Sequence, residues 1–258
     1  MKQKKVILIS IDGMRPDGLL TCGNPYVDTM RAEATYSLDV QTVFPPVTLP
    51  CHISMFHSVP PERHGITTNT YVPQMRPVEG LGERLKHAGK VNAMFYGWGP
   101  LRDISRPSDF HYAEFAGIHM LERCDDYLTD RAIACVRERH PDFVFLYLGT
   151  TDEVGHDSGW MCPPYLEALA IAIDDVKRVR EACGDEYSII VTADHGGHDR
   201  MHGADIPEDM TIPMFCFGDA FERGKQFRGG SILDVAPTIV DLFGIEPNED
   251  WEGKSLLK

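Results

Sequence analysis

Three short apolar runs, each leading into an aspartate, constrain the fold of this chain more than any other feature. The pairs are residues 6–11 with Asp12, residues 143–148 with Asp152, and residues 187–191 with Asp194. Continuous apolar runs of this length are typical of strands buried on both faces of a parallel sheet. Because ligands of such sheets bind beyond the carboxyl ends of the strands, the sequence predicts three carboxylates on one rim. One such aspartate could be a helix N-cap, but three together repel one another unless cations are bound.

The rest of the chain alternates between strand and helix patterns. Further strands are expected at 37–44, 91–96 and 212–217, and helices at 77–88, 121–139, 164–183 and 231–243, the last with Pro237 inside it. This alternation predicts an α/β fold, a doubly wound, mostly parallel sheet with helices on both faces. Residues 97–119 are the least regular and indicate a long loop or small insertion over one edge of the sheet.

Composition narrows the class of partner. The chain has 258 residues and a formal net charge of −14, and binding to a phosphate backbone requires clustered Lys and Arg. We therefore expect no nucleic-acid polymer as partner. No apolar stretch approaches the ~20 residues of a membrane span, so no membrane association is expected. The seven cysteines contain no C-x-x-C pair, which favours reduced thiols and a cytoplasmic location.

Histidines complete a metal-binding pattern. His156 follows Asp152 by four residues, His195 is adjacent to Asp194, and His202 lies in a glycine-bounded loop. Aspartate and histidine are the ligands that zinc and related ions prefer. Three of each suffice for two divalent ions with positions left for substrate. The three imidazoles favour zinc over manganese as the metal.

Thr48 is the candidate nucleophile. It follows two prolines and stands where a strand exit turns into an expected helix, whose N–H groups would face a bound anion. Coordination to a metal ion lowers the pKa of a hydroxyl and so makes it a better nucleophile. The alternative is that Thr48 is merely the N-cap of a helix over 49–56.

These motifs resemble the type I phosphodiesterase/nucleotide pyrophosphatase branch of the alkaline phosphatase superfamily. The resemblance rests on residues 43–51, 61–66 and Asn69, and on the order of the Asp and His motifs. It implies one alkaline-phosphatase-like catalytic domain over 1–258. It also implies one zinc ion held by Asp12, Thr48, Asp194 and His195, and a second held by Asp152, His156 and His202.

The resemblance also assigns roles. Thr48 would attack phosphorus and form a phospho-threonine intermediate, and Asn69 would bind a phosphoryl oxygen. His202 is preferred to His198 as the last ligand because a glycine follows it, as in the family pattern. His64 has no ligand position left and is expected to be structural. His52 and His57 are expected to be surface or packing residues.

The prediction is a two-metal hydrolase of small phosphate esters, of phosphodiester or nucleotide pyrophosphate type. Phosphomonoesterase, phosphonate hydrolase or phosphoryl-transfer activity on the same site is an alternative, as is a metal-bound binding protein without turnover. Sulfatase activity is disfavoured because the segment from Cys51 lacks the proline and arginine of the C-x-P-x-R motif. The segment between Asp152 and His202 is too short for a large cap. Trp98 and Arg102, or Arg106, could bind the leaving group, or could simply be solvated loop side chains.

Overall fold

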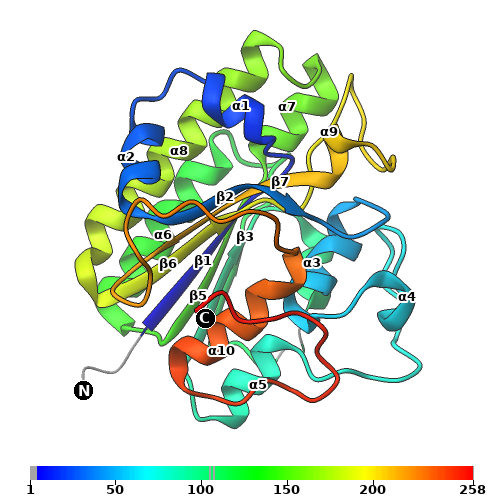
Figure 1. The fold of residues 1–258 in the computed structure, drawn as a ribbon, viewed down its shortest axis with the longest axis vertical. Helices are drawn as coiled ribbons and strands as arrows, with labels where there is room; N and C mark the ends of the chain where they lie inside the picture. The colour runs from blue at the N-terminus through cyan, green and yellow to red at the C-terminus, as the bar shows by residue number, and fades with distance from the viewer. Residues whose placement is uncertain (1–4, 105, 107, 258) are drawn as a thin grey trace.

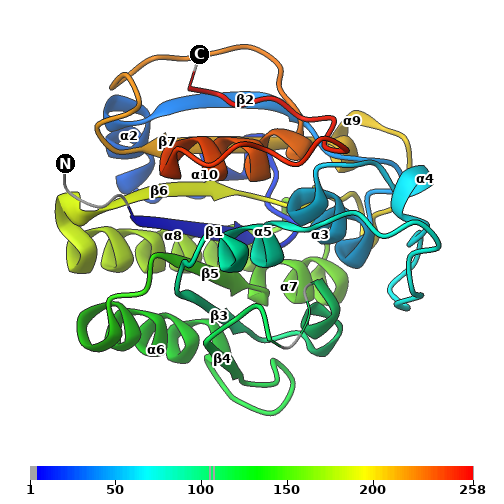
Figure 2. The same cartoon turned by 90° about the horizontal axis from the view of Figure 1, so that it is seen from below.

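The computed structural model describes residues 5–104, 106 and 108–257. Its centre is a seven-stranded sheet in the order β2-β7-β6-β1-β5-β3-β4, which can be followed in Figure 2. The strands are β1 (Lys5–Ile11), β2 (Thr35–Gln41), β3 (Asn92–Tyr96), β4 (Tyr112–Phe115), β5 (Phe143–Leu148), β6 (Tyr187–Thr192) and β7 (Thr211–Phe217). β1 pairs in parallel with β5 and β6, and β3 pairs in parallel with β4 and β5. β7 pairs antiparallel with both of its neighbours, β2 and β6, and the other described strand pairs of the sheet are parallel, so the predicted, mostly parallel sheet is confirmed.

Helices cover both faces of the sheet, as predicted (Figures 1 and 2). One face carries α1 (Pro16–Thr21), α2 (Tyr26–Glu33), α6 (Cys124–Arg139), α7 (Thr150–Ser158) and α8 (Pro163–Cys183). The other carries α3 (Thr48–His57), α5 (Leu81–His87) and α10 (Val235–Phe243). The short helices are α4 (Pro61–His64), α9 (Pro207–Met210) and the 3₁₀ turns η1 (Gly99–Ile104), η2 (Gly184–Glu186) and η3 (Ile232–Asp234).

Two expectations need correction. The irregular segment 97–119 is not only a loop, because Tyr112–Phe115 pair with β3 and form the edge strand β4. Three of these four residues are exposed, so the strand lacks the apolar alternation that would have marked it. The helix expected over 231–243 begins only at Val235, so Pro237 lies in the first turn of α10, where its missing N–H is not needed. Ser105 and Pro107 lie outside the described residues.

The central strands end side by side. Ile11 of β1 is opposite Leu148 of β5, and Ser10 is opposite Thr192 of β6. The three segments that follow these strands therefore leave the sheet at the same edge. All residues between Asp152 and His202 are described, and α7, α8 and β6 occupy that stretch without an inserted cap. Among the described helices, none is long and apolar enough to cross a membrane.

Candidate active site

Three buried carboxylates lie at the carboxyl ends of β1, β5 and β6. Asp12 follows β1 directly, Asp152 stands in the first turn of α7, and Asp194 follows β6. The side chains of Asp12 and Asp194 are 1% and 0% exposed, and that of Asp152 is 11% exposed. In the described part of the chain, Oδ1 of Asp12, Oδ1 of Asp152 and Oδ2 of Asp194 are buried with no hydrogen-bond partner. Since an unpartnered buried carboxylate oxygen is costly, this arrangement fits bound cations.

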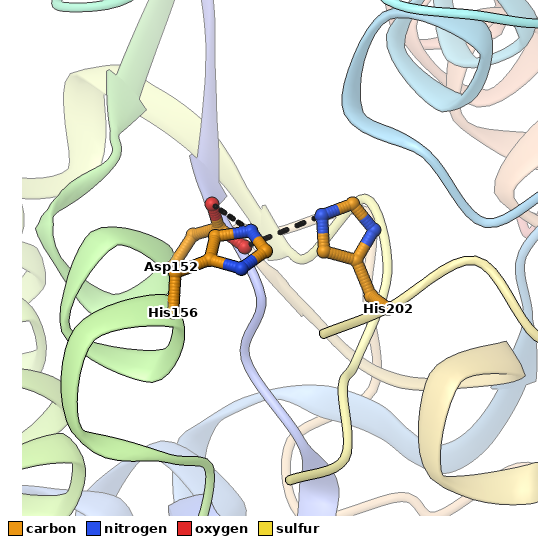
Figure 3. Close-up of side chains that lie close together, drawn as sticks. All are labelled: Asp152, His156 and His202. Carbon is orange, nitrogen blue, oxygen red and sulfur yellow. Dashed lines mark ion pairs between the residues drawn. The ribbon is translucent and has the colours of Figure 1, made fainter. Parts of the chain in front are cut away.

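Three histidine rings face these carboxylates. Nε2 of His156 lies 3.4 Å from Oδ2 of Asp152, and Nε2 of His202 lies 3.9 Å from Oδ1 of the same residue (Figure 3). Nε2 of His195 lies 3.3 Å from Oδ1 of Asp12 and 3.3 Å from Oδ2 of Asp194. The His195 and His202 rings stack with their centroids 3.8 Å apart. The imidazoles predicted to bind metal therefore converge on one place.

Each of these rings is held by a backbone carbonyl. Nδ1 of His156 lies 3.0 Å from the carbonyl oxygen of Arg200. Nδ1 of His195 lies 2.8 Å from that of Gly196, and Nδ1 of His202 lies 2.8 Å from that of Pro46. Because Nδ1 donates in each pair, the free lone pair is on Nε2, which faces the carboxylates. This is the usual support of a metal-binding histidine.

His198 is placed differently. Its Nδ1 lies 2.7 Å from Oδ1 of Asp209, a fully buried carboxylate outside the site. The ring is not among the groups of donor atoms that approach one another closely, whereas His202 is. The structure thus brings His202, and not His198, to the other candidate ligands.

The donor atoms form two groups of three. One consists of Asp152, His156 and His202, and the other of Asp12, Asp152 and His195, and within each group the atoms lie within 4.8 Å of one another. Asp152 is common to both groups and so lies between them. Asp and His donors in threes suit divalent ions such as zinc.

The electrostatics of the cluster also fit cations. Burial raises the pKa of Asp194 to about 8 and that of Asp152 to about 7, and repulsion from Asp152 adds to the shift at Asp194. Burial, followed by repulsion from Asp194, raises the pKa of Asp12 well above its usual value. Burial lowers the pKa of His195 and His202, so both imidazoles are neutral and able to donate a lone pair.

The Asp152-bearing helix α7 is fixed from another element. The carboxylate of Asp125, near the start of α6, accepts the N–H of Gly149 at 3.1 Å and of Thr150 at 2.9 Å. These are backbone donors at the N-terminal end of α7, which its own residues leave unpaired. Asp125 thereby fixes the place where α7 begins, and with it Asp152.

Thr48 is the first residue of α3 and faces the cluster. Its Oγ1 lies 3.2 Å from Nε2 of His195. The N-cap alternative is wrong, because Val47 occupies the N-cap position and no side chain caps the helix. The expected anion cradle of helix N–H groups is also wrong in part. Leu49 donates its N–H to Asn69, Pro50 has none, and Cys51 donates to the carbonyl of Val47.

Asn69 is an exposed residue beside the start of α3. Its Oδ1 accepts the N–H of Leu49 at 3.0 Å, next to Thr48. Among the residues that the structure describes, no hydrogen bond uses its Nδ2. The amide therefore has donors left for a ligand at the N-terminal end of α3.

Trp98 and Arg102 lie apart from the cluster. The Arg102 side chain is 73% exposed, and its Nε lies 3.6 Å from Oδ2 of Asp103. With His57, at the C-terminal end of α3, it lines a cavity of about 600 Å³. Trp98 is half-buried and packs against the core. Within the described residues, neither side chain has a hydrogen bond, ion pair or ring contact with the candidate ligands.

His52 was missed as part of the site. Its Nδ1 lies 2.8 Å from the carbonyl oxygen of Thr48 and 3.4 Å from Oδ2 of Asp194, and its Nε2 lies 3.0 Å from Oγ of Ser10. Of the two positions expected for His52 and His57, the surface or the packed interior, burial shows the interior for both. The four-residue spacing from Thr48 was the available signal, since it places His52 one turn along the same helix.

Two further side chains support the site and its surroundings. Tyr147 of β5 donates its hydroxyl to Oδ2 of Asp12 in a short hydrogen bond. His64 is buried, with Nε2 3.0 Å from Oγ of Ser54 and Nδ1 accepting the N–H of Ile66. These contacts suit the structural role expected for His64.

Similarity to known proteins identifies the family of the chain. The family described as type I phosphodiesterase/nucleotide pyrophosphatase matches residues 6–205. The chain belongs to this family.

Its curated relatives include 2,3-bisphosphoglycerate-independent phosphoglycerate mutases. The Clostridioides difficile protein is 30% identical over 141 residues, covering 50% of this chain and 26% of the mutase. That of Natronomonas pharaonis is 33% identical over 145 residues, covering 51% and 27%. The chain spans about a quarter of the length of these relatives.

Solved structures show the fold of the family. Murine ectonucleotide pyrophosphatase/phosphodiesterase 5, as an inactive threonine-to-alanine variant in complex with AMP, superposes with a TM-score of 0.83 at 14% identity over 97% of both chains. A 2-O glycosaminoglycan sulfatase gives a TM-score of 0.75 at 14% identity, over 98% of this chain and 73% of the sulfatase. The predicted alkaline-phosphatase-like α/β fold is thus confirmed.

Proposed function

We propose that the chain is a two-metal hydrolase that uses Thr48 to cleave phosphodiester or nucleotide pyrophosphate bonds in small molecules. The carrying observation is the Thr48 hydroxyl, which lies 3.2 Å from Nε2 of His195 and beside the two groups of Asp and His donors. Membership of the family supports the same class of reaction. We assign the activity to one catalytic domain over residues 1–258.

The proposed ligands follow from the donors that face one another. Asp12, Thr48, Asp194 and His195 would hold one ion, and Asp152, His156 and His202 the other. The unpartnered carboxylate oxygens and the free Nε2 atoms support this assignment. Zinc is the proposed metal, with manganese second, because three imidazoles are present. Bound divalent ions lower the pKa of a hydroxyl and neutralise charge on a phosphoryl group.

Thr48, Asn69 and His52 have different roles in the proposed reaction. Oγ1 of Thr48 gives up its proton to solvent and attacks phosphorus, and the bond between phosphorus and the leaving oxygen breaks. The phosphoryl group, with its remaining ester when the substrate is a diester, is then carried on Thr48. The leaving oxygen takes a proton from water, and a second water hydrolyses the phospho-threonine and restores the hydroxyl. The free donors of Asn69 bind a non-bridging phosphoryl oxygen at the start of α3. His52 holds the Thr48 carbonyl and so sets the position of the nucleophile.

Phosphoryl transfer is the second candidate, because the curated relatives are mutases. It differs only in the acceptor, which would be a substrate hydroxyl instead of water. Trp98 and Arg102 remain predictions for the leaving group. A cytoplasmic location is proposed from the cysteines, all seven of which are free thiols.

Replacing the hydroxyl tests the proposal. Thr48→Ala is expected to lower turnover of a chromogenic diester by roughly 10³-fold or more, while the metal content stays near two ions per chain. Thr48→Ser retains a hydroxyl and is the matched control, with partial activity expected. A monoester assayed alongside distinguishes the phosphomonoesterase alternative. Full diester turnover by Thr48→Ala would sink the assignment of the nucleophile, and metal binding without turnover of any ester by the unaltered chain would favour a binding protein.

A further inference from the structure

Trp160 lies at the junction of the segments that carry the candidate ligands. It follows α7 directly and is 6% exposed. Its Nε1 donates to the carbonyl oxygen of Gly13, the residue after Asp12, at 2.9 Å. Its backbone N–H donates to the carbonyl oxygen of Asp199, in the loop that leads to His202, at 2.7 Å. One residue therefore joins the end of β1, the end of α7 and the loop after β6.

The indole also contacts two of the candidate ligands. The His156 ring stands nearly perpendicular to it, at 87°, with the ring centroids 5.1 Å apart. The His202 ring lies at 68° to it, with the centroids 6.1 Å apart. Edge-to-face contacts of this kind fix the relative orientation of the rings. The tryptophan is thus packed against both imidazoles of the group formed by Asp152, His156 and His202.

Two glycines allow this packing. A Cβ on Gly155 would lie 2.7 Å from the indole, and a Cβ on Gly197 would lie 2.2 Å from it. Neither glycine has a positive φ, so backbone conformation does not require glycine at these positions. Close approach of the indole does require it. Gly155 precedes His156, and Gly197 lies between His195 and His202. The indole can therefore pack against the segments that carry these histidines, because neither glycine has a side chain in its way.

We propose that Trp160 is a positioning residue that sets the metal affinity of the group formed by Asp152, His156 and His202. This rests on the proposed function in that a metal ion binds these residues. The indole offers no metal-binding atom, so its effect is on the spacing and orientation of the ligands. Loss of a supporting contact of this kind typically lowers metal affinity by roughly 10- to 100-fold.

The test compares two tryptophans in matched environments. Trp160→Phe keeps an aromatic ring but loses the Nε1 donor and part of the ring that contacts Gly197. The Gly13 carbonyl still accepts the hydroxyl of Tyr165 at 2.9 Å, so the variant leaves no unpaired acceptor there. Trp251→Phe is the control, because Trp251 is 9% exposed and donates Nε1 to the carbonyl of Glu79 at 2.8 Å, far from the ligands in the chain.

The readout is metal affinity, measured on metal-free protein by competition with a chromophoric zinc chelator. Trp160→Phe is expected to lower the affinity for one of the two zinc ions by roughly 10- to 100-fold. Trp251→Phe is expected to leave the affinity for both ions unchanged. Trp160 as the sole tryptophan, in a Trp98→Phe/Trp251→Phe variant, is expected to change its emission as one of the two ions binds. Wild-type affinity for both ions in Trp160→Phe would overturn the proposal, even if the variant were less stable.

A second variant decides the matter if Trp160→Phe does not fold. Gly155→Ala improves the helix propensity of α7, yet its Cβ meets the indole. Weaker binding of one ion is expected here too, and unchanged binding of both ions would overturn the proposal. Failure of the proposed function is distinguishable, because then the unaltered chain would bind no second ion, or Thr48→Ala would retain full activity.

Discussion

The Thr48 hydroxyl lies 3.2 Å from Nε2 of His195, although 147 positions separate the two residues in the chain. The contact exists because α3 begins beside the carboxyl ends of the parallel strands. His52 supports this contact, because its Nδ1 lies near both the Thr48 carbonyl oxygen and the Asp194 carboxylate. The position of the hydroxyl is therefore set by the same buried residues that are proposed to bind metal.

Asn69 offers a test of how the phosphoryl group is held. Asn69→Ala removes both the acceptor for the Leu49 N–H and the free Nδ2 donors, and we expect kcat/KM for a diester to fall by roughly 100- to 1,000-fold, as for other transition-state hydrogen bonds. Asn69→Asp keeps an oxygen for Leu49 but places a negative charge where the donors were. We expect it to lose at least as much activity as Asn69→Ala. Near-normal activity in Asn69→Asp would mean that Asn69 only supports α3.

The strand-end aspartates could be predicted because their signal is local. A buried run followed by a carboxylate can be recognised without knowing the partners of the strand, and parallel pairing then places Asp12, Asp152 and Asp194 on one edge. The same holds for the histidines spaced a few residues from them. The alternation of strands and helices likewise predicted the sheet.

The supporting residues could not be predicted, because their contacts depend on how helices pack. Nothing in the sequence around His52 shows that its ring lies between Ser10 and Asp194. The packing of Trp160 against Gly155 and Gly197 depends on where the loop after β6 returns. The edge strand β4 was missed because exposed strands carry little hydrophobic pattern.

Metal removal should destabilise the fold in a pH-dependent way. In the metal-free protein the pKa values of Asp194 and Asp152 are raised to about 8 and about 7, above the ~4 of an unfolded chain. The metal-free fold therefore binds more protons than the unfolded chain and loses stability as pH rises from about 4 to about 8. Bound ions keep the carboxylates charged and stabilise the fold by roughly 3–4 kcal/mol at saturation.

Thermal unfolding with and without a chelator checks this. We expect the difference in Tm between the metal-loaded and the chelated protein to widen as pH rises from about 5 to about 8. Adding back zinc should restore the Tm. A difference that stays constant or narrows with rising pH would contradict the account.

Asp175 of α8 provides a pH test away from the site. Burial, followed by repulsion from Asp126, raises its pKa to about 7, although the ion pair with Arg178 lowers it. Its Oδ2 is a buried atom without a hydrogen-bond partner among the described residues. The folded chain favours the protonated form, so the stability due to this group is present below about pH 4 and is lost as pH rises to about 7. Asp175→Asn should therefore stabilise the protein by ~1–3 kcal/mol at neutral pH and above.

Urea unfolding of the variant and the unaltered chain at low and at neutral pH measures this difference, in which the contribution of the metal site cancels. The control is Asp130→Asn, which contacts the same Arg178 from an exposed position and should change stability by less than about 1 kcal/mol. A variant Asp175→Asn that is less stable than the unaltered chain at neutral pH would refute the argument.

Arg102 tests where the leaving group lies. It lines a cavity with His57, at the opposite end of α3 from Thr48, and these ends are roughly 14 Å apart at 1.5 Å per residue. A small chromogenic diester does not span that distance. Arg102→Ala should then leave its kcat/KM almost unchanged and raise KM only for substrates with a long, anionic leaving group. A large rise in KM for the smallest diester would instead place Arg102 at the reacting phosphoryl group.

The most direct test of the central claim is to trap the intermediate. A diester is mixed with the metal-loaded enzyme, the reaction is quenched in acid within one turnover, and the peptides are analysed by mass spectrometry. We expect one added phosphoryl group, or phosphoryl ester, on the peptide that begins α3, located at Thr48, and none in Thr48→Ala. Normal turnover with no modification at Thr48 at any quench time, or modification at another residue, would contradict the claim.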